Sequence, residues 1–323
     1  MNVLITGGAG FLGLQLARLL LQRGALQLSG KSVAIDRLTL LDVVAPQIDD
    51  ARVRVVTGDL SDPAVLAQAI DRDTGVIFHL AAVVSGQAEA DFDLGMRVNL
   101  DASRALLETC RRIGHVPRVV FTSSVAVYGG ELPPVVQDDT ALNPQSSYGV
   151  QKAIGELLLS DYSRRGFVDG RVLRLPTISV RPGKPNAAAS SFASGIIREP
   201  LSGIAANCPV APDTALWLLS PRGAIHALVN GIELDGARLG NRRVVNLPGL
   251  SVTAAQMVEA LRRVAGDAVA DRVSWQREPR VENIVGTWPA AWDVTRAKAL
   301  GFESDASFDD VIRAYAQDAG IAL

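Results

Sequence analysis

Two side chains that could carry acid–base chemistry, Tyr148 and Lys152, stand four residues apart in the sequence. The run that contains them is amphipathic, and residues four apart share one face of a helix. An ammonium beside a phenol favours the phenolate, so we expect Lys152 to lower the pKa of Tyr148 towards neutrality. A tyrosine that accepts a proton near neutral pH suits the oxidation of an alcohol to a carbonyl. The pair alone is a weak signal, because such spacings also arise by chance on helix surfaces.

A glycine-rich turn follows a short apolar run at the start of the chain. Residues 3–6 predict a strand that is buried on both faces, and an amphipathic helix begins directly after the turn. Glycines at this point allow a tight turn, the approach of a pyrophosphate to backbone N–H groups, and close packing of the helix on the strand. We therefore predict a dinucleotide site; a glycine-rich turn without a ligand is the alternative. Its residues are Gly7, Gly10, Phe11, Leu12 and Gly13.

Two carboxylates end the next predicted strands. Asp42 closes the apolar run 38–42, where a carboxylate that binds the cofactor ribose belongs, whereas its rival Asp36 precedes that run. No Arg follows Asp42, and a carboxylate would repel the 2′-phosphate of NADP, so we predict NAD as the cofactor. Asp59, near the end of the predicted strand 52–60, is placed to accept a hydrogen bond from the adenine amino group, with Leu60 as an apolar wall beside it.

Further buried strands are predicted at 76–82, 118–124, 171–178 and 244–247, and helices at 96–113 and 148–165. This alternation predicts an α/β fold with a doubly wound parallel Rossmann-type sheet. Ligands of such sheets bind beyond the carboxyl ends of the strands, where Leu80, Ala81, Ala82, Ser123 and Ser124 fall.

We expect two regions in the chain. An NAD-binding Rossmann domain is predicted at 1–180, with a returning segment at about 223–250. The composition changes after residue 181, where Pro, Gly, Ala and Ser become frequent. Residues 181–222 and 251–323 are therefore predicted to form a smaller substrate-binding region.

Composition limits the other functions. The chain has 323 residues and a net charge of −2, so no basic surface favours nucleic acid or an anionic membrane. The two cysteines and three histidines are scattered outside metal-ligand spacings, and we predict no metal site. The first residues lack a signal-peptide pattern, and no run of about 18 apolar residues predicts a membrane span. We expect a soluble cytoplasmic protein.

Several motifs together resemble the extended short-chain dehydrogenases/reductases. In chain order they are Gly7-x-x-Gly10-x-x-Gly13, Gly58-Asp59-Leu60, Leu80-Ala81-Ala82, Ser124 to Gly129, Tyr148-x-x-x-Lys152, Leu173 to Pro176 and Asp293 to Phe302. The resemblance therefore covers the whole chain. It implies that Tyr148 is the general acid/base and that Lys152 lowers its pKa while holding the nicotinamide ribose.

The same resemblance implies roles for other positions. Ser124 would hydrogen-bond the reacting oxygen, with its neighbour Ser123 as the alternative. Asn99 matches the asparagine that supports an active-site water and the lysine, and it belongs with Pro176 and Ile178 to the expected cofactor site.

The predicted substrate depends on a segment in which this sequence differs from many members of the family. Members that act on nucleotide-linked sugars usually carry an Arg/Tyr-Asp-Tyr/Phe-Ile/Val-His segment in their second half, which residues 215–222 lack. The chain looks most like the members that oxidise a small free sugar acid, D-erythronate, at C2 to 2-oxotetronate. The expected substrate contacts are Ser85, Ser123, Ser124, Tyr148, Thr177, Ser190, Trp217 and Arg222.

Alternatives remain for some of these contacts. A carboxylate needs a cation or several donors, and Arg174 and Arg181 compete with Arg222 for that role, although Arg174 lies in a predicted strand. Trp288 competes with Trp217 for closing the pocket.

Two other functions also remain open. One is a nucleotide-sugar epimerase or dehydratase with tightly held NAD; the other is a regulator that binds NAD(H) without chemistry, which ranks last because both Tyr148 and Lys152 are present. The resemblance further implies a homodimer formed through helices 96–113 and 148–165. Cys110, Leu157 and Leu158 are apolar enough for either this interface or the core.

Overall fold

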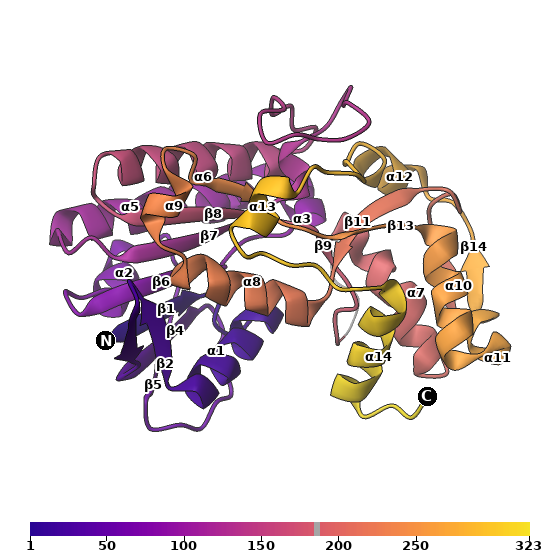
Figure 1. The fold of residues 1–323 in the computed structure, drawn as a ribbon, viewed down its shortest axis with the longest axis horizontal. Helices are drawn as coiled ribbons and strands as arrows, with labels where there is room; N and C mark the ends of the chain where they lie inside the picture. Colours follow the sequence, from indigo (N-terminus) through magenta and orange to yellow (C-terminus); the bar gives the residue numbers. More distant parts are fainter. Residues whose placement is uncertain (184–187) are drawn as a thin grey trace.

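A seven-stranded parallel sheet forms the centre of the larger part of the computed structural model, which describes residues 1–183 and 188–323 (Figure 1). Its strand order is β12-β8-β7-β6-β1-β4-β5, which confirms the predicted doubly wound sheet. The chain proceeds from β1 to β4 and β5 on one side and then returns to β6 on the other, so the ligand crevice is expected beside β1 and β6. The strands are β1 (Asn2–Thr6), β4 (Arg37–Asp42), β5 (Val53–Thr57), β6 (Thr74–His79), β7 (Arg118–Ser124), β8 (Asp169–Leu175) and β12 (Val244–Asn246).

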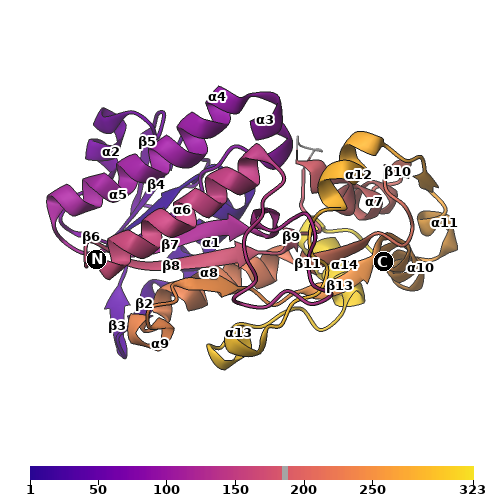
Figure 2. The ribbon, with the colours of Figure 1, turned by 90° about the horizontal axis from the view of Figure 1, so that it is seen from above.

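Helices cover both faces of this sheet, as the view from above shows (Figure 2). One face carries α1 (Phe11–Arg23) and α8 (Pro221–Glu233); the other carries α2 (Pro63–Ala69), α5 (Ala102–Ile113) and α6 (Ser147–Arg164). Successive strand residues point to opposite faces, so Ile5 joins the core beneath α1 and α8 while Leu4 joins the core beneath α5. Burial on both faces explains the unbroken apolar run in β1.

A smaller part lies beside the large sheet (Figure 1) and has its own hydrophobic core. A three-stranded sheet contains β9 (Thr177–Ile178), β11 (Ala215–Leu219) and β13 (Leu250–Thr253), and β10 (Ala206–Cys208) pairs with β14 (Val273–Trp275). The helices are α7 (Phe192–Leu201), α10 (Ala254–Ala265), α11 (Asp267–Ala270), α12 (Pro279–Val285) and α14 (Phe308–Ala319). A capping box of Thr253 and Gln256 opens α10.

Several predicted elements have different bounds in the structure. The strand expected at 171–178 is two strands, because Pro176 offers no N–H to the ladder and separates β8 from β9, which pairs with β11. The strand expected at 76–82 ends at His79, and residues 80–82 leave the sheet. The helix expected from residue 96 begins as a π-helix (Met96–Asp101) before it continues as α5.

Short elements complete the fold. An antiparallel hairpin of β2 (Ala25–Leu28) and β3 (Lys31–Ala34), which we did not predict, connects α1 with β4. Leu300 and Phe302 pack into the core of the large sheet, so part of the segment 251–323 returns to that sheet. The remaining elements are α3 (Ser85–Ala90), α4 (Phe92–Gly95), α9 (Gly236–Leu239), α13 (Thr295–Ala299) and 3₁₀ turns at Val125–Val127 and Ala189–Ser191.

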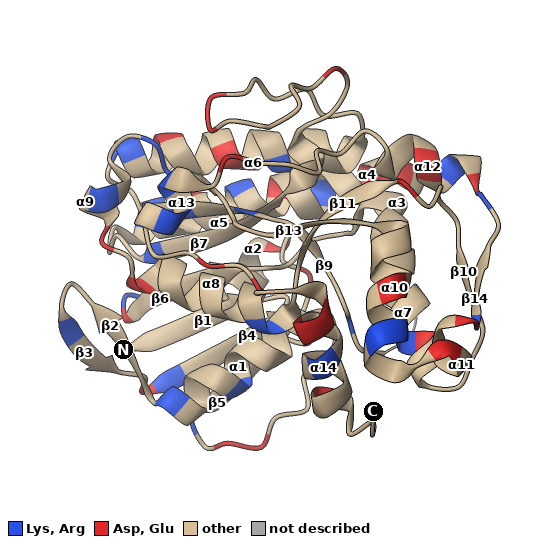
Figure 3. Ribbon diagram, turned by 45° about the vertical axis from the view of Figure 1, so that its right-hand side comes forward, with Lys and Arg blue, Asp and Glu red and all other residues tan. Residues whose placement is uncertain are grey.

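Charged residues of both signs are interspersed over the helices and loops (Figure 3), in keeping with the net charge of −2. Among residues 1–183 and 188–323, no helix is long and apolar enough to cross a membrane. Within those same ranges, no three His, Cys, Asp or Glu side chains gather into a group that could hold a metal ion.

Candidate active site

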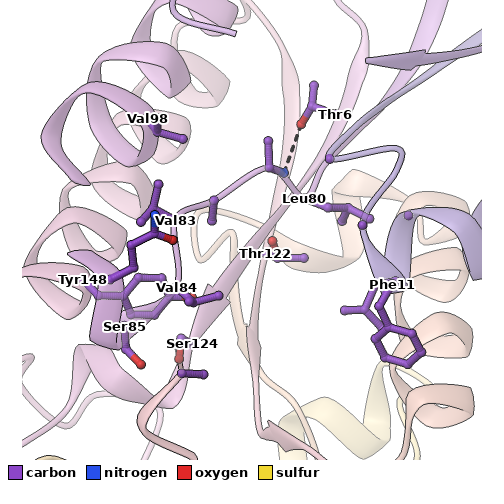
Figure 4. Close-up of a pocket in the computed structure, with 18 of the residues that line it drawn as sticks. Thr6, Phe11, Leu80, Val83, Val84, Ser85, Val98, Thr122, Ser124 and Tyr148 are labelled. Atoms are coloured by element: carbon purple, nitrogen blue, oxygen red, sulfur yellow. Dashed lines mark hydrogen bonds between the residues drawn. The ribbon is translucent and has the colours of Figure 1, made fainter. Parts of the chain in front are cut away.

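A cavity of about 620 Å³ opens beyond the carboxyl ends of β1, β4, β5, β6, β7 and β8. Figure 4 shows Tyr148, Ser124 and Ser85 close together at one end of the view, with Phe11 of α1 on the opposite side. The hydrogen bond from the Ala81 N–H to Thr6 Oγ1, at 3.3 Å, joins the ends of β1 and β6 at the crevice. The cavity therefore lies where the reversal of strand order predicts a ligand site.

The glycine turn forms a backbone cradle at the β1 end of this cavity. A Cβ on Gly13 would lie 2.1 Å from the carbonyl oxygen of Gly7, and Gly7 itself has φ +72° and would meet Ala81 N at 2.9 Å. Side chains are thus excluded from these positions by backbone contacts. No side chain caps the first turn of α1, so its N–H groups face the cavity mouth without a competing carboxylate or hydroxyl. These features fit a pyrophosphate.

Asp42 lies at the carboxyl end of β4 and lines the cavity, whereas Asp36 pairs with the N-terminal ammonium at the opposite end of the strand. The Asp42 carboxylate accepts hydrogen bonds from the N–H of Ala9 at 2.9 Å and of Val43 at 2.7 Å. It therefore also fixes the glycine turn. A carboxylate already held in place at the strand end is well suited to a ribose diol.

Asp59 lines the cavity, but its carboxylate forms an ion pair with Arg97 of the π-helix. Hydrogen bonds from the N–H and hydroxyl of Ser61, at 2.8 and 2.7 Å, hold the other carboxylate oxygen. These contacts lower the pKa of Asp59 against the opposing effect of burial. The carboxylate is therefore charged and can accept a hydrogen bond from an amino group.

Tyr148 begins the buried face of α6, and close backbone packing brings it to the end of β7. Ser146 caps α6 by accepting from the N–H of Gly149 at 3.2 Å. A Cβ at Gly149 would lie 2.1 Å from the carbonyl oxygen of Ala126, so glycine allows α6 to approach the turn after Ser124. Tyr148 and Ser124 both line the cavity, and the Ser124 hydroxyl is near enough to lower the pKa of Tyr148.

We expected Lys152 to lower the pKa of Tyr148, and this expectation is wrong for the side chains as they lie in the structure. Burial raises the pKa of Tyr148 to about 12, although the neighbouring Ser124 hydroxyl and the positive charge of Arg181 both lower it. The Lys152 Nζ lies 5.7 Å from the centroid of the Tyr148 ring and instead donates to the carbonyl oxygen of Thr122 at 2.8 Å. Burial also lowers the pKa of Lys152 to about 7, because the charged ammonium is less stable in the buried site than in water.

Asn99 does not contact Lys152 through its side chain. Its Oδ1 accepts from the N–H of Val83 at 2.8 Å, and its Nδ2 donates to the carbonyl oxygen of Val83 at 3.1 Å and to Gln151 Oε1 at 2.7 Å. The amide therefore fixes the cavity wall at Val83 to α6. The predicted support of Lys152 by Asn99 stays a prediction.

Ser123 and Ser124 face different partners. Ser123 donates to Glu156 Oε1 at 2.5 Å, away from Tyr148, whereas Ser124 is the serine that contacts Tyr148. Arg174 forms two parallel hydrogen bonds with the same Glu156, at 2.6 and 2.9 Å. Its charge is therefore already paired with a carboxylate of the protein. Arg174 is not among the residues that line the cavity. The geometry thus favours Ser124 over Ser123 as the serine beside the reacting oxygen.

Most of the predicted site residues line this one cavity. They are Gly7, Gly10, Phe11, Leu12, Gly13, Asp42, Asp59, Leu60, Leu80, Ala81, Ala82, Ser85, Ser123, Ser124, Tyr148, Pro176, Thr177, Ile178 and Ser190. Lys152 and Asn99 lie behind its wall, at 1 % exposure each, and act there only through neighbours or after a rearrangement.

Two predicted substrate contacts lie elsewhere. Trp217 is buried, stacks on Trp292 with ring centroids 6.1 Å apart, and donates to the carbonyl oxygen of Leu247, because alternate residues of β11 point into the core. Arg222 forms an ion pair with Asp318 of α14 and lines a separate small pocket next to α8. Neither lines the main cavity, so the structure does not bring them together with the other predicted substrate contacts.

One alternative to each of these two residues does line the cavity. Trp288, which follows α12, is one of the lining residues, and so is Arg181. In the described part of the chain, the Arg181 guanidinium has no ion pair and no hydrogen bond; only the main-chain N–H and C=O of this residue bond, to Ser194 and Arg198. Burial and Arg198 lower the pKa of Arg181, while Tyr148 raises it. An unpaired cation beside Tyr148 is suited to an anionic substrate.

Sequence reasoning missed several lining residues, among them Arg97 and Gln87. Both lie on the segment 85–101, where short helices precede and begin the helix that was predicted only from residue 96. No periodic pattern marks their direction in such a segment. The alternation of charge between Asp93 and Arg97, four residues apart, was the one available sign of a shared helical face.

Comparison with known proteins adds independent findings. The model of the NAD dependent epimerase/dehydratase family matches residues 3–213. The chain is 88 % identical over 323 residues to the D-erythronate dehydrogenase of Cupriavidus necator, with all of both chains covered. It is 47 % identical over 317 residues to the D-erythronate dehydrogenase of Haemophilus influenzae, with 98 % of each covered.

A solved structure also agrees in fold. The crystal structure described as a nucleoside-diphosphate-sugar epimerase from Agrobacterium tumefaciens superposes with a TM-score of 0.92 at 43 % identity. The match covers 100 % of this chain and 95 % of that one.

Proposed function

The chain belongs to the NAD dependent epimerase/dehydratase family, and we propose that it oxidises the C2 hydroxyl of D-erythronate to 2-oxotetronate with NAD. The observation that carries the substrate is the 88 % identity, over the full length of both chains, to the D-erythronate dehydrogenase of Cupriavidus necator. The enzyme is an oxidoreductase and its cofactor is NAD.

The cavity fits this cofactor. The glycine cradle, in which a Cβ would collide with backbone at Gly7 and Gly13, would hold the pyrophosphate, and Asp42 would hold the adenosine ribose. Asp59 and Leu60 would flank the adenine. When bound, NAD supplies the carbon that accepts the hydride and a ring cation that favours the phenolate.

Tyr148, Ser124 and Lys152 supply the proton chemistry in this proposal. The Ser124 hydroxyl, which already contacts Tyr148, would hold the C2 oxygen next to the phenol. Tyr148 would take the proton of the C2 hydroxyl as general base, and Lys152 would hold the nicotinamide ribose. Burial raises the pKa of the tyrosine, so the proton is accepted only where the surrounding positive charges compensate.

Arg181 would bind the carboxylate of the acid. It lies in the same cavity as Tyr148, no described carboxylate pairs with its guanidinium, and its charge acts directly on the tyrosine. Thr177, Ser190 and Ser85 line the same cavity with hydroxyl groups that could receive the remaining substrate hydroxyls. Trp288 would contribute an apolar wall.

Initial rates test this function against its alternative, a nucleotide-sugar epimerase, which the description of the Agrobacterium structure favours. The purified enzyme is incubated with NAD and, separately, with C4 to C6 aldonates or with UDP- and dTDP-sugars, and NADH absorbance or epimer formation is followed. Preferred oxidation of D-erythronate with added NAD supports the proposal. Rapid epimerisation of a nucleotide sugar, with no aldonate oxidation, would refute it.

The assembly, location and division of the chain are also part of this proposal. We place the protein in the cytoplasm and assign NAD binding to residues 1–180 and about 223–250. Residues 181–222 and 251–323, apart from those that return to the large sheet, would form the substrate end. A homodimer is supported by exposed apolar side chains along α6 and the preceding α4, namely Val150, Leu157 and Phe92, with exposures of 42 %, 68 % and 59 %. Cys110 is fully buried and belongs to the core.

A further inference from the structure

Three functional groups of α6, Tyr148, Lys152 and Glu156, follow one another at intervals of four residues. That spacing places them along one face of the helix, the face that packs against β7 and β8. Glu156 and Lys152 are buried, with exposures of 2 % and 1 %. A carboxylate is rarely buried to this extent unless other groups compensate its charge.

The Glu156 carboxylate is held in one place by two elements. Arg174 of β8 donates to both carboxylate oxygens, at 2.6 and 2.9 Å, and Ser123 of β7 donates to Oε1 at 2.5 Å. The residue after Ser123 is Ser124, which contacts Tyr148. Glu156 therefore connects the helix that carries Tyr148 and Lys152 with the strand end that carries Ser124.

Few other charges face Lys152. Its Nζ lies between the carbonyl oxygen of Thr122, at 2.8 Å, and the ring of Phe121, 4.6 Å from the ring centroid, neither of which carries a net charge. His79 of β6 is neutral at working pH, because burial first and Lys152 second lower its pKa to about 3. Glu156 is the one group in the described chain whose charge opposes the effect of burial on the pKa of Lys152.

We propose that Glu156 is a positioning residue for catalysis: its buried carboxylate keeps Lys152 charged and anchors the strand end that presents Ser124. The kinetic part of this inference rests on the proposed dehydrogenase function; the electrostatic part does not. Arg174 and Ser123 hold the carboxylate in this arrangement and do not act on the substrate.

Two variants separate the electrostatic role from a structural one. Glu156→Gln and Arg174→Gln break the same ion pair, but only the first removes the carboxylate. The chain has four lysines, so ¹³C labelling at Cε gives few NMR signals, and Lys152→Arg identifies the one that belongs to Lys152. Circular dichroism and thermal unfolding establish that each variant is folded.

The Lys152 titration midpoint should fall by about one pH unit or more in Glu156→Gln, because its one opposing charge is removed. In Arg174→Gln it should stay at the wild-type value or rise, since the carboxylate is then less neutralised. An unchanged midpoint in Glu156→Gln, or the same fall in both variants, would overturn the proposal.

A buried charge without its partner can prevent folding. The double variant Glu156→Leu, Arg174→Met removes both charges, and its Lys152 midpoint should fall as well; a wild-type midpoint there refutes the role of Glu156. In kinetics, the descending high-pH limb of kcat/KM for D-erythronate should move to lower pH in Glu156→Gln. A wild-type enzyme that does not oxidise D-erythronate would refute the proposed function and leave the NMR result standing.

Discussion

The ammonium of Lys152 donates a hydrogen bond to the carbonyl oxygen of Thr122 at 2.8 Å, which ties α6 to β7 beneath the floor of the cavity. The Lys152 Nζ lies 5.7 Å from the centroid of the Tyr148 ring and does not contact its hydroxyl in this arrangement. Ser124 and Arg181 are the groups that lower the pKa of Tyr148. Ser124 and Arg181 therefore set the local environment of the Tyr148 phenol, whereas Lys152 lies behind the cavity wall.

Replacing Tyr148 by Phe should lower kcat by about 10²–10⁴-fold, because the variant loses the proton acceptor and little else. Binding of NAD, measured by calorimetry or by quenching of protein fluorescence, should stay within a few-fold of wild type. Turnover close to that of the wild-type enzyme would remove Tyr148 from its assigned role.

Arg181 and Arg222 provide a matched pair for the carboxylate contact. Arg181→Ala should raise KM for D-erythronate by roughly 10- to 100-fold, the equivalent of about 1.5–3 kcal/mol for a charged hydrogen bond, with KM for NAD unchanged. Arg222→Ala should leave both constants near wild type, because that arginine pairs with Asp318 outside the cavity. If steady-state kinetics instead show a raised KM for D-erythronate only in Arg222→Ala, Arg222 binds the substrate carboxylate.

Asp42 should decide the choice between NAD and NADP. In Asp42→Asn the charge that repels a 2′-phosphate is gone, while the amide oxygen can still accept from the N–H of Ala9. The ratio of kcat/KM for NAD to that for NADP should fall by roughly tenfold or more. Asp36→Asn serves as the control, since that carboxylate lies at the far end of β4, and it should leave the ratio unchanged.

The pH dependence of stability follows from Lys152, whose pKa is lowered from 10.5 to about 7 by burial. Between these two values the unfolded chain binds more protons at this site than the folded chain, so this lysine makes stability rise with pH. Below about pH 7 the ammonium is buried in the folded state and its full cost is present. Urea unfolding from pH 6 to 9 should therefore show a smaller rise for Lys152→Met than for the wild type; equal slopes would contradict the lowered pKa.

Leu157 tests the proposed dimer. Its side chain is 68 % exposed on α6, and Leu157→Glu should place a charge in the proposed interface and yield a monomer by light scattering. Ile204, 58 % exposed in the smaller part of the molecule, is the control, and Ile204→Glu should keep the wild-type mass. A wild-type protein that is already monomeric at micromolar concentration would exclude the dimer.

The sequence by itself determined the sheet and the cofactor end of the cavity. Strands buried on both faces appear in the sequence as unbroken apolar runs. The functional residues, from the glycines to Asp42 and Ser124, lie at the end of such a run or within a few residues of it. Because parallel strands bring those ends to one edge, order along the chain was enough to predict that they meet. The separation of β8 from β9 at Pro176 could also have been predicted from the sequence, because proline has no N–H to donate to the hydrogen-bond ladder of a sheet.

Only the tertiary structure decided the substrate end. Arg181, Arg222, Trp217 and Trp288 are equally plausible by residue type, and their positions depend on how the smaller part packs against the large sheet. The pKa of Tyr148 was likewise beyond the sequence: spacing placed a lysine near the phenol, but burial, which depends on the whole fold, outweighed it. Local spacing fixes which groups share a helix face, whereas desolvation and long-range packing fix what those groups can do.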